Sequence, residues 1–129
     1  MNREFIVPAG VAPPPDPYTH AVRAGDTLYI AGQVARDEYS EVIGAGDARR
    51  QAEQCWKNIE FILRAAGGQL ADIVKVTIFL KDTRYAAAER DVREGLFQEG
   101  RYPIATQVQV VNLAHPDFLM EIDAIAVLG

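Results

Sequence analysis

The last quarter of the chain, residues 104–128, reads IATQVQVVNLAHPDFLMEIDAIAVL and predicts two long β-strands. Residues 105–113 alternate well enough between apolar and polar side chains to form a strand in a sheet. Residues 118–128 are more apolar, so this strand is expected to be buried more deeply. The short loop 114–117 joins the two segments, and we expect them to form a hairpin.

The second of these strands carries two acidic residues, Glu121 and Asp123. Because they are two residues apart, a strand directs both carboxylates to the same face of the sheet. A carboxylate in an otherwise apolar strand needs a partner, whether its role is structural or functional. We therefore expect one wall of any functional site to lie here.

Composition and charge are those of an ordinary globular chain. The 129 residues, 49% hydrophobic and 24% charged, predict a single domain over residues 1–129 with a sizeable core. The net charge of -5 disfavours a general surface for nucleic acids or anionic membranes. The one cysteine, Cys55, allows no internal disulfide and suits a reducing cytosol. No signal pattern and no apolar run of membrane-spanning length is present, so a cytoplasmic protein is expected.

The N-terminal part predicts short strands around a proline-rich segment. Residues 3–7 are a candidate first strand, and residues 8–17 hold five of the seven prolines, which excludes a helix there. This segment is either a surface tether or a fixed loop along the body of the protein. Residues 21–24 and 27–31 flank a Gly-Asp pair, which predicts a tight hairpin.

Two helices are predicted in the middle of the chain. The clearer one covers residues 48–66, with Asp47 as its N-cap and a Gly-Gly pair after its end. Its apolar face consists of Ala52, Cys55, Trp56, Ile59, Ile62, Leu63 and Ala66. Core packing rather than catalysis is therefore expected for Cys55 and Trp56. The second helix, over residues 84–99, has a thinner stripe made of Tyr85, Ala88, Val92 and Leu96.

Residues 72–81 predict a strand between the helices, with Val74, Val76, Ile78 and Leu80 on its apolar face. The resulting order β-β-α-β-α-β-β predicts an α+β domain of two layers, a mixed sheet with two helices on one face. The uncovered face is expected to bear Thr77, Phe79, Val108, Val110, Ile125 and Val127. An apolar surface of this kind favours symmetric association between copies of the chain. Candidate sites would then lie in clefts between subunits.

Several familiar catalytic motifs are missing from the sequence: GxSxG, a glycine-rich phosphate loop, HExxH and paired cysteines. His20 and His115 are far apart, each in or beside a loop that contains proline, and both are expected to be surface or loop histidines. With one cysteine they make a poor ligand set, so neither a metal nor another cofactor is expected. Cys55 is predicted to be buried and is therefore a weak candidate nucleophile.

A set of short motifs nevertheless runs through almost the whole chain. It consists of Asp16-Pro17-Tyr18-Thr19, Ala31-Gly32-Gln33, Gln51 with Asn58-Ile59, Pro103-Ile104-Ala105 and residues 121–126. Taken together, these motifs resemble the Rid (YjgF-like) family of small trimeric proteins. The resemblance implies a chorismate-mutase-like fold and a homotrimer whose three sheets form a central barrel. It also implies ligand clefts between the subunits.

The resemblance also implies an activity. The best-understood Rid proteins hydrolyse reactive enamine or imine acids to a keto acid and ammonia. The arginine of the family's Pro-Ala-Arg turn holds the substrate carboxylate, a task that suits a planar bidentate cation. The glutamate of the last strand, here Glu121, holds or activates the water. Tyr18 and the Ala31-Gly32-Gln33 turn line the pocket.

The sequence departs from the family pattern at two of these positions. Ala105 stands where the family has its arginine, and Ala31 stands where it has serine. Losing a buried carboxylate–arginine pair is costly, so a substrate other than the usual 2-aminoacrylate is expected. Arg90 and Arg101 are the candidate replacement cations, and the alternative is that both are ordinary solvated arginines.

The favoured interpretation is a Rid-like hydrolase or deaminase that acts on a small imine, enamine or related organic substrate. The predicted catalytic residues are Glu121 as general base and Tyr18 as hydrogen-bond donor. The predicted substrate-binding residues are Ala31, Gly32, Gln33, Arg90, Arg101, Ala105, Thr106 and Gln107. The alternative is a non-catalytic ligand-binding or interaction trimer that has lost the deaminase site. A ribonuclease is a distant third, because the net charge is negative and no histidine pair is visible.

Overall fold

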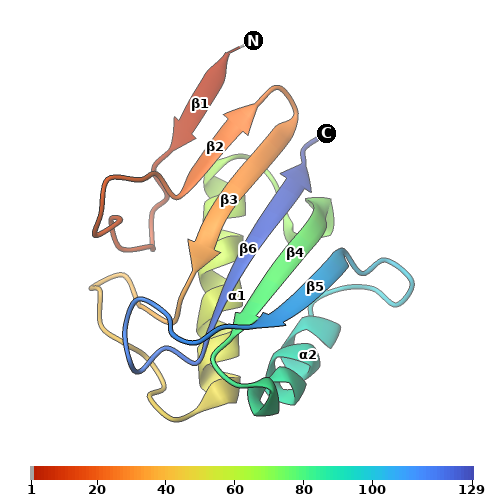
Figure 1. Ribbon diagram of the computed structural model, residues 1–129. Helices are drawn as coiled ribbons and strands as arrows, with labels where there is room; N and C mark the ends of the chain where they lie inside the picture. The colour runs from red at the N-terminus through yellow and green to blue at the C-terminus, as the bar shows by residue number, and fades with distance from the viewer. Residues whose placement is uncertain (1) are drawn as a thin grey trace.

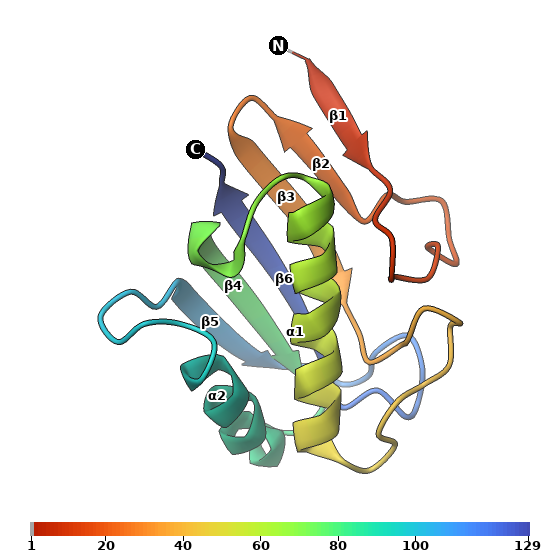
Figure 2. The ribbon, with the colours of Figure 1, turned by 180° about the vertical axis from the view of Figure 1, so that it is seen from behind.

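The computed structural model describes residues 2–129 as a six-stranded mixed sheet with two α-helices packed on one face (Figures 1 and 2). The strands are β1 (Arg3–Ile6), β2 (Ala21–Ala24), β3 (Thr27–Gln33), β4 (Ile73–Leu80), β5 (Ile104–Gln109) and β6 (Met120–Val127). The helices are α1 (Ala48–Ala65) and α2 (Ala86–Glu94), with short 3-10 turns at Leu70–Asp72 and Thr83–Tyr85. The predicted α+β fold of two layers is confirmed. Within residues 2–129, neither helix has the length and hydropathy needed to cross a membrane.

The two C-terminal strands do not form a hairpin, so that prediction is wrong. The sheet order β1-β2-β3-β6-β4-β5 places β4 between them. β4 pairs with β6 in antiparallel register and with β5 in parallel register. The crossover through α2 returns the chain to the end of the sheet where β4 began, and β5 therefore runs parallel to β4. The connection spans residues 110–119 rather than 114–117.

The predicted long helix is confirmed as α1. The Asp47 side chain caps it by accepting a hydrogen bond from the Arg50 backbone N–H at 3.0 Å. All seven apolar side chains predicted for its inner face are buried, including Cys55 and Trp56. Gly67, with a φ of 81°, follows the helix in the left-handed region that favours glycine. The core lies between α1 and the alternate inward-facing residues of β3, β4 and β6.

The strand β4 begins on a different face from the one predicted. Val74 was expected in the core, but it is exposed, and Ile73 is buried instead. The register between β4 and β6 shifts between Ile73 and Lys75, and an irregularity of this kind changes the face that the following side chains take. From Val76 onward the predicted alternation is confirmed.

The second helix is shorter than predicted, because α2 ends at Glu94 rather than at Glu99. Gly95, a poor helix former, follows directly. Leu96 and Phe97 therefore pack on the core from irregular chain. The helix α2 packs against α1, as Figure 2 shows. The buried residues of α2 are apolar except for one carboxylate.

That carboxylate is Glu89, whose burial no apolar pattern indicated. The buried residues of α2 are Ala86, Glu89 and Val92, not the predicted stripe through Tyr85 and Ala88. Glu89 is 0% exposed, and its Oε2 accepts a hydrogen bond from Trp56 Nε1 at 3.0 Å. Its Oε1 lies 3.0 Å from Arg93 Nη2, in an ion pair that lacks the alignment of a hydrogen bond. Burial raises the pKa of Glu89, and the nearby Arg93 and Trp56 offset part of that rise.

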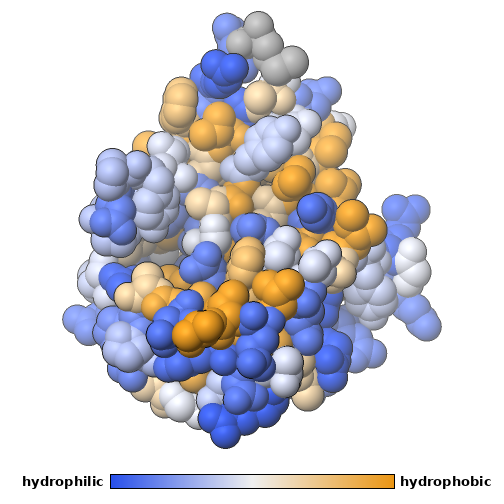
Figure 3. Space-filling model, viewed as in Figure 1, coloured by the Kyte–Doolittle hydropathy of each residue, from blue (hydrophilic) through white to orange (hydrophobic). Residues whose placement is uncertain are grey.

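The sheet face opposite the helices is exposed and partly apolar. Tyr29, Val108 and Val127 on its strands are 51%, 38% and 48% exposed. Figure 3, which views this face, shows apolar side chains gathered in patches between polar ones. The other residues predicted for this face, Thr77, Phe79, Val110 and Ile125, are partly exposed. The association that was expected to cover this face stays a prediction.

Candidate functional site

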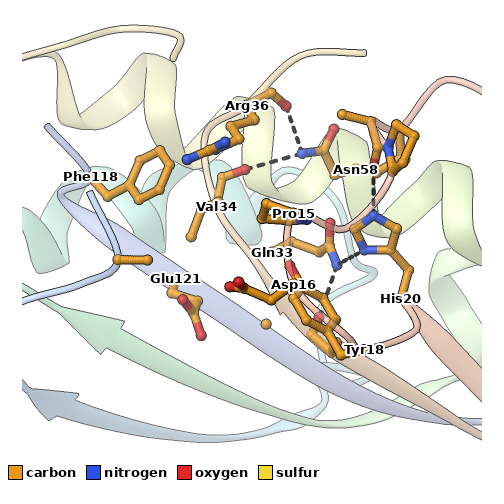
Figure 4. Close-up of a pocket in the computed structure, with 16 residues that line it drawn as sticks. Pro15, Asp16, Tyr18, His20, Gln33, Val34, Arg36, Asn58, Phe118 and Glu121 are labelled. Atoms are coloured by element: carbon orange, nitrogen blue, oxygen red, sulfur yellow. Dashed lines mark hydrogen bonds between the residues drawn. The ribbon is translucent and has the colours of Figure 1, made fainter. Parts of the chain in front are cut away.

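A cavity of about 330 Å³ opens where the proline-rich loop, the end of β3 and the start of β6 meet (Figure 4). Val11, Pro13 and Pro15 form part of its wall. The segment of residues 8–17 is therefore a fixed loop against the body of the protein, and the alternative of a tether is wrong. Asn58 of α1 and Phe118, just before β6, also line it.

Five of the ten predicted site residues line this cavity. They are Tyr18, Ala31, Gly32, Gln33 and Glu121. They come from the loop before β2, from β3 and from β6, so the fold brings the last strand against two segments from the start of the chain. The motifs predicted these residues for a cleft between subunits, and their roles there stay predictions.

The other five predicted residues lie outside the cavity of the same chain. Arg90 is exposed on α2, and Arg101 is exposed in the segment before β5. Ala105, Thr106 and Gln107 are exposed on β5, which forms one edge of the sheet. They were predicted for a cleft between subunits, where a neighbouring chain would supply part of the wall, and their role stays a prediction.

The Glu121 side chain is positioned by an irregularity in β3. The pairing of β3 with β6 shifts register between Ile30 and Gln33, and Gly32 lies in the shifted stretch. A Cβ at Gly32 would collide with the Glu121 carboxylate, so only glycine leaves room for that side chain. Glu121 alternates with buried neighbours along β6 and faces the cavity.

The surroundings of Glu121 make its carboxyl harder to ionise than a solvated one. Burial raises the pKa of the Glu121 carboxyl, and the negative charge of Asp123 on the same face raises it further. Within residues 2–129 the structure shows no hydrogen bond to the Glu121 carboxylate. This group is therefore a stronger base than a solvated glutamate, and its oxygens are free to bind water or a ligand.

Tyr18 enters the cavity from the proline-rich loop. Its ring meets the His20 ring edge to face, with centroids 6.1 Å apart and planes at 88°. Burial raises the pKa of the Tyr18 phenol, and the nearby carboxylates of Asp16 and Glu121 raise it further. The hydroxyl therefore keeps its proton and can donate it in a hydrogen bond.

His20 was expected to be a surface or loop histidine; it lies in the loop before β2, and it is buried there, at 8% exposed. Its Nε2 lies 2.7 Å from the Ala12 carbonyl and donates to it, while Nδ1 accepts from Gln33 Nε2 at 3.2 Å. Gln33 also donates to the Ala31 carbonyl at 3.0 Å. Gln33 therefore joins β3 to the proline-rich loop, and its amide hydrogens already have partners. No periodic pattern in the sequence indicated this pair.

Arg36 is a cavity residue that the sequence analysis missed. Of the arginines in residues 2–129, it is the one that lines this cavity. Its guanidinium carbon lies 5.1 Å from the centre of the Phe118 ring, and Figure 4 shows the side chain reaching toward that ring. Arg36 lies beyond the end of β3 in irregular chain, where periodicity gives no signal.

Comparisons with known proteins show similarity along almost the whole chain. The family model described as Endoribonuclease L-PSP matches residues 10–128. A RutC family protein of Pyrococcus horikoshii is 40% identical over 124 residues, which cover 96% of this chain and 97% of the relative. The 3-aminoacrylate deaminase RutC of Acinetobacter baylyi is 38% identical over 126 residues, 98% of each chain. The crystal structure of Escherichia coli TdcF with bound serine superimposes with a TM-score of 0.89 at 29% identity and covers 98% of this chain and 99% of its own.

Proposed function

This chain belongs to the Endoribonuclease L-PSP family, which confirms its resemblance to the Rid (YjgF-like) proteins, and from this premise we propose that it is a hydrolytic deaminase. Its substrate would be a small enamine or imine acid other than 2-aminoacrylate. The name of the Acinetobacter relative, a 3-aminoacrylate deaminase, supports this class of chemistry. The family description alone does not assign RNA cleavage to the chain.

The observation that carries the proposal is the position of the Glu121 carboxylate. It lies in the cavity, against Gly32, and Tyr18 lines the same cavity. A general base works best when its pKa is raised toward the operating pH, and burial raises the pKa of Glu121 in that direction. A carboxylate with this environment is suited to hold and deprotonate a water molecule.

The proposed reaction begins with the imine tautomer of the substrate. Glu121 accepts a proton from water while the water oxygen bonds to the carbon of the C=N group. The electron pair of the C=N π bond moves to nitrogen, which takes up a proton from the solvent, and a carbinolamine forms. Glu121 then gives its proton to the amino group, the C–N bond breaks, and ammonia leaves as the C=O bond forms and the hydroxyl proton passes to the solvent. The sum is one imine and one water converted to one carbonyl compound and one ammonia. Tyr18 donates a hydrogen bond within the cavity.

We further propose that the working site lies at a boundary between subunits of a homotrimer. The exposed apolar face of the sheet supports association, because a surface of this kind is usually covered by a partner. In such an assembly, Ala105, Thr106 and Gln107 on a neighbouring β5 would complete the cleft. A sedimentation measurement that gives a monomer at assay concentration would refute this part of the proposal.

The alternative, a non-catalytic binding protein, is favoured by one observation. The side chain at residue 31 is a methyl group, and the nearby Gln33 and Asn58 amides are already engaged with protein groups. The cavity therefore has few free polar groups besides Glu121, Asp16, Tyr18 and Arg36. Ribonuclease activity is supported less well, because Asp16 and Glu121 would repel a phosphate and the chain has a net charge of -5.

The test is a deamination assay on 3-aminoacrylate and on 2-iminobutanoate generated in solution, with 2-aminoacrylate for comparison. We expect the protein to consume at least one of the first two faster than water alone, and faster than it consumes 2-aminoacrylate. Glu121→Gln should lower the rate by about 10²-fold or more, because it removes the general base. Glu94→Gln, at an exposed position on α2, is the control. Wild-type rates equal to the spontaneous ones would favour the binding protein, and full activity of Glu121→Gln would refute the role of Glu121.

A further inference from the structure

The proposed chemistry does not use Arg36, although its guanidinium belongs to the same cavity wall as Glu121 and Tyr18. We propose that Arg36 binds the carboxylate of the substrate and so selects small acids over their neutral analogues. This inference rests on the proposed function, since it concerns the same site. Neither Arg90 nor Arg101, the two cations that the sequence suggested, lines this cavity.

The backbone around Arg36 is held in place by a buried amide. Asn58 is 2% exposed, and its Nδ2 donates to the Val34 carbonyl at 3.1 Å and to the Arg36 carbonyl at 2.9 Å. Gln54 Nε2 donates in turn to Asn58 Oδ1 at 2.9 Å, which fixes the orientation of the amide. Arg36 also forms a β-bridge with Val42. The backbone position of Arg36 is therefore fixed, although the residue lies outside the regular helices and strands.

The side chain of Arg36 is held by Phe118. The guanidinium lies over the ring face at 5.1 Å from its centre, a geometry that leaves the N–H groups at its edge able to bind an anion. Phe118 is itself 1% exposed. The flanking backbone is fixed by Gln51, which donates to the Asp117 carbonyl and accepts from the Leu119 N–H, both at 2.8 Å. Two buried amides on α1 thus fix the backbone on which this contact depends: Asn58 at Arg36 and Gln51 beside Phe118.

Arg36 has no competing partner among residues 2–129, where no carboxylate lies within 4.0 Å of its guanidinium in an ion pair. The positive charge of Arg36 nevertheless acts inside the cavity, because it lowers the pKa of the Tyr18 phenol. Burial, Asp16 and Glu121 have larger effects in the opposite direction, so the pKa is raised overall. An unpaired, oriented guanidinium is the group best suited to bind a carboxylate in a bidentate manner.

The rest of the cavity limits the size and charge of the bound molecule. Its volume of about 330 Å³ suits a small organic acid. Asp16 and Glu121 repel a second negative charge, so a monoanion fits better than a dianion. In the proposed binding mode, the substrate carboxylate pairs with Arg36 and the C=N group faces Glu121, since both residues line this cavity.

Calorimetric titration with stable analogues tests this inference without requiring turnover. The probes are 2-oxobutanoate and 3-hydroxybutanoate, each compared with its methyl ester, which has lost the charge. We expect at least one acid to bind about tenfold or more tightly than its ester, since the ester cannot form the ion pair. Arg36→Gln should reduce the affinity for that acid to the level of its ester and leave the affinity for the ester unchanged. Arg64→Gln, at an exposed position on α1, is the matched control.

The outcomes separate this inference from the proposed function. Equal affinity of the wild-type protein for the acids and their esters overturns the role of Arg36, whatever the activity. So does an active Arg36→Gln variant with unchanged acid affinity and unchanged kcat/KM. Selective acid binding through Arg36 in a protein that lacks deaminase activity would refute the enzyme and leave the inference standing. If Arg36→Gln proves unstable, Arg36→Lys decides, since it keeps the charge and should retain part of the preference for the acid.

Discussion

The Glu121 carboxylate lies directly against the backbone of Gly32, in the space that a Cβ at residue 32 would occupy. The two residues belong to neighbouring strands, β6 and β3, at the point where their pairing shifts register. Irregularities of this kind are common beside active sites, because they redirect a side chain without disturbing the rest of the sheet. Here the shift and the glycine together let a carboxylate enter the cavity.

The first prediction follows from this contact. Gly32→Ala should lower deaminase activity by about 10²-fold, because a displacement of about an ångström at the reacting group is enough to do so. The free energy of unfolding should change by less than about 1 kcal/mol, since the obstructing atoms belong to the end of a flexible side chain. Steady-state kinetics and urea unfolding measure the two effects. Gly95→Ala, where a Cβ meets only backbone atoms at 3.6 Å or more, is the control.

The second prediction concerns the dependence of activity on pH. Glu121 must be ionised to act as a base, so kcat/KM should rise with pH through its pKa, which burial and Asp123 hold above the usual range. Asp123→Asn removes one of these two causes and should move the acidic limb of the profile to lower pH. Asp91→Asn, at an exposed position on α2, should leave the limb where it is. An unmoved limb in Asp123→Asn would show that Glu121 does not control it.

The third prediction concerns the dependence of stability on pH. Burial raises the pKa of Glu89 in the folded protein, so the native state binds this proton more tightly than the unfolded chain does. The protonated carboxyl of Glu89 therefore contributes fully to the free energy of unfolding at pH values below the ordinary glutamate pKa. This contribution is lost as the pH rises through the pKa that Glu89 has in the folded protein. Glu89→Gln cannot ionise but can still accept from Trp56 Nε1.

The stability of Glu89→Gln relative to the wild type should accordingly increase as pH rises across that window. Urea unfolding of both proteins at a series of pH values measures the difference. Glu94→Gln, on the exposed side of the same helix, should show no such trend. A constant difference between Glu89→Gln and the wild type would contradict the assignment of a raised pKa to Glu89.

The fourth prediction addresses the support of Arg36. Asn58→Ala leaves the Val34 and Arg36 carbonyls without their donor and should lower the free energy of unfolding by about 1–3 kcal/mol. Because Arg36 loses its fixed position, the affinity for 2-oxobutanoate or 3-hydroxybutanoate, whichever the wild-type protein binds, should fall while the affinity for its ester does not. Gln98→Ala, an exposed residue, is the control for both measurements. Unchanged acid binding by folded Asn58→Ala would show that Arg36 does not depend on this amide.

Local patterns in the sequence predicted a helix or hairpin correctly where all the signals for it lie within one segment of the chain. The apolar face of α1, with Asp47 before it and two glycines after it, was correct because helical periodicity, capping and termination all act within one segment. The hairpin of β2 and β3 was correct for the same reason, since Gly25 adopts a φ of 62° in its turn. The pairing of β5 with β4 was missed, because strand order depends on the crossover rather than on proximity in the sequence.

The candidate site was predicted in part. Residue-by-residue resemblance indicated Glu121, Gly32 and Tyr18, and the fold brings these three to one cavity. Arg36 was missed because it takes its place from a contact with Phe118, which is distant in the sequence. His20 was predicted as a surface or loop histidine, but its contact with Gln33 was missed. No spacing rule connects such pairs.

The sequence by itself thus determined the class of fold, the long helix, the family and the carboxylate of the last strand. These features depend on periodicity and on motifs, which are local properties of the chain. The tertiary structure decided the order of the strands, the burial of Glu89 and the position of Arg36 in the cavity wall with Glu121. The physical reason is that packing between distant segments, not local propensity, selects which polar groups share a space shielded from water.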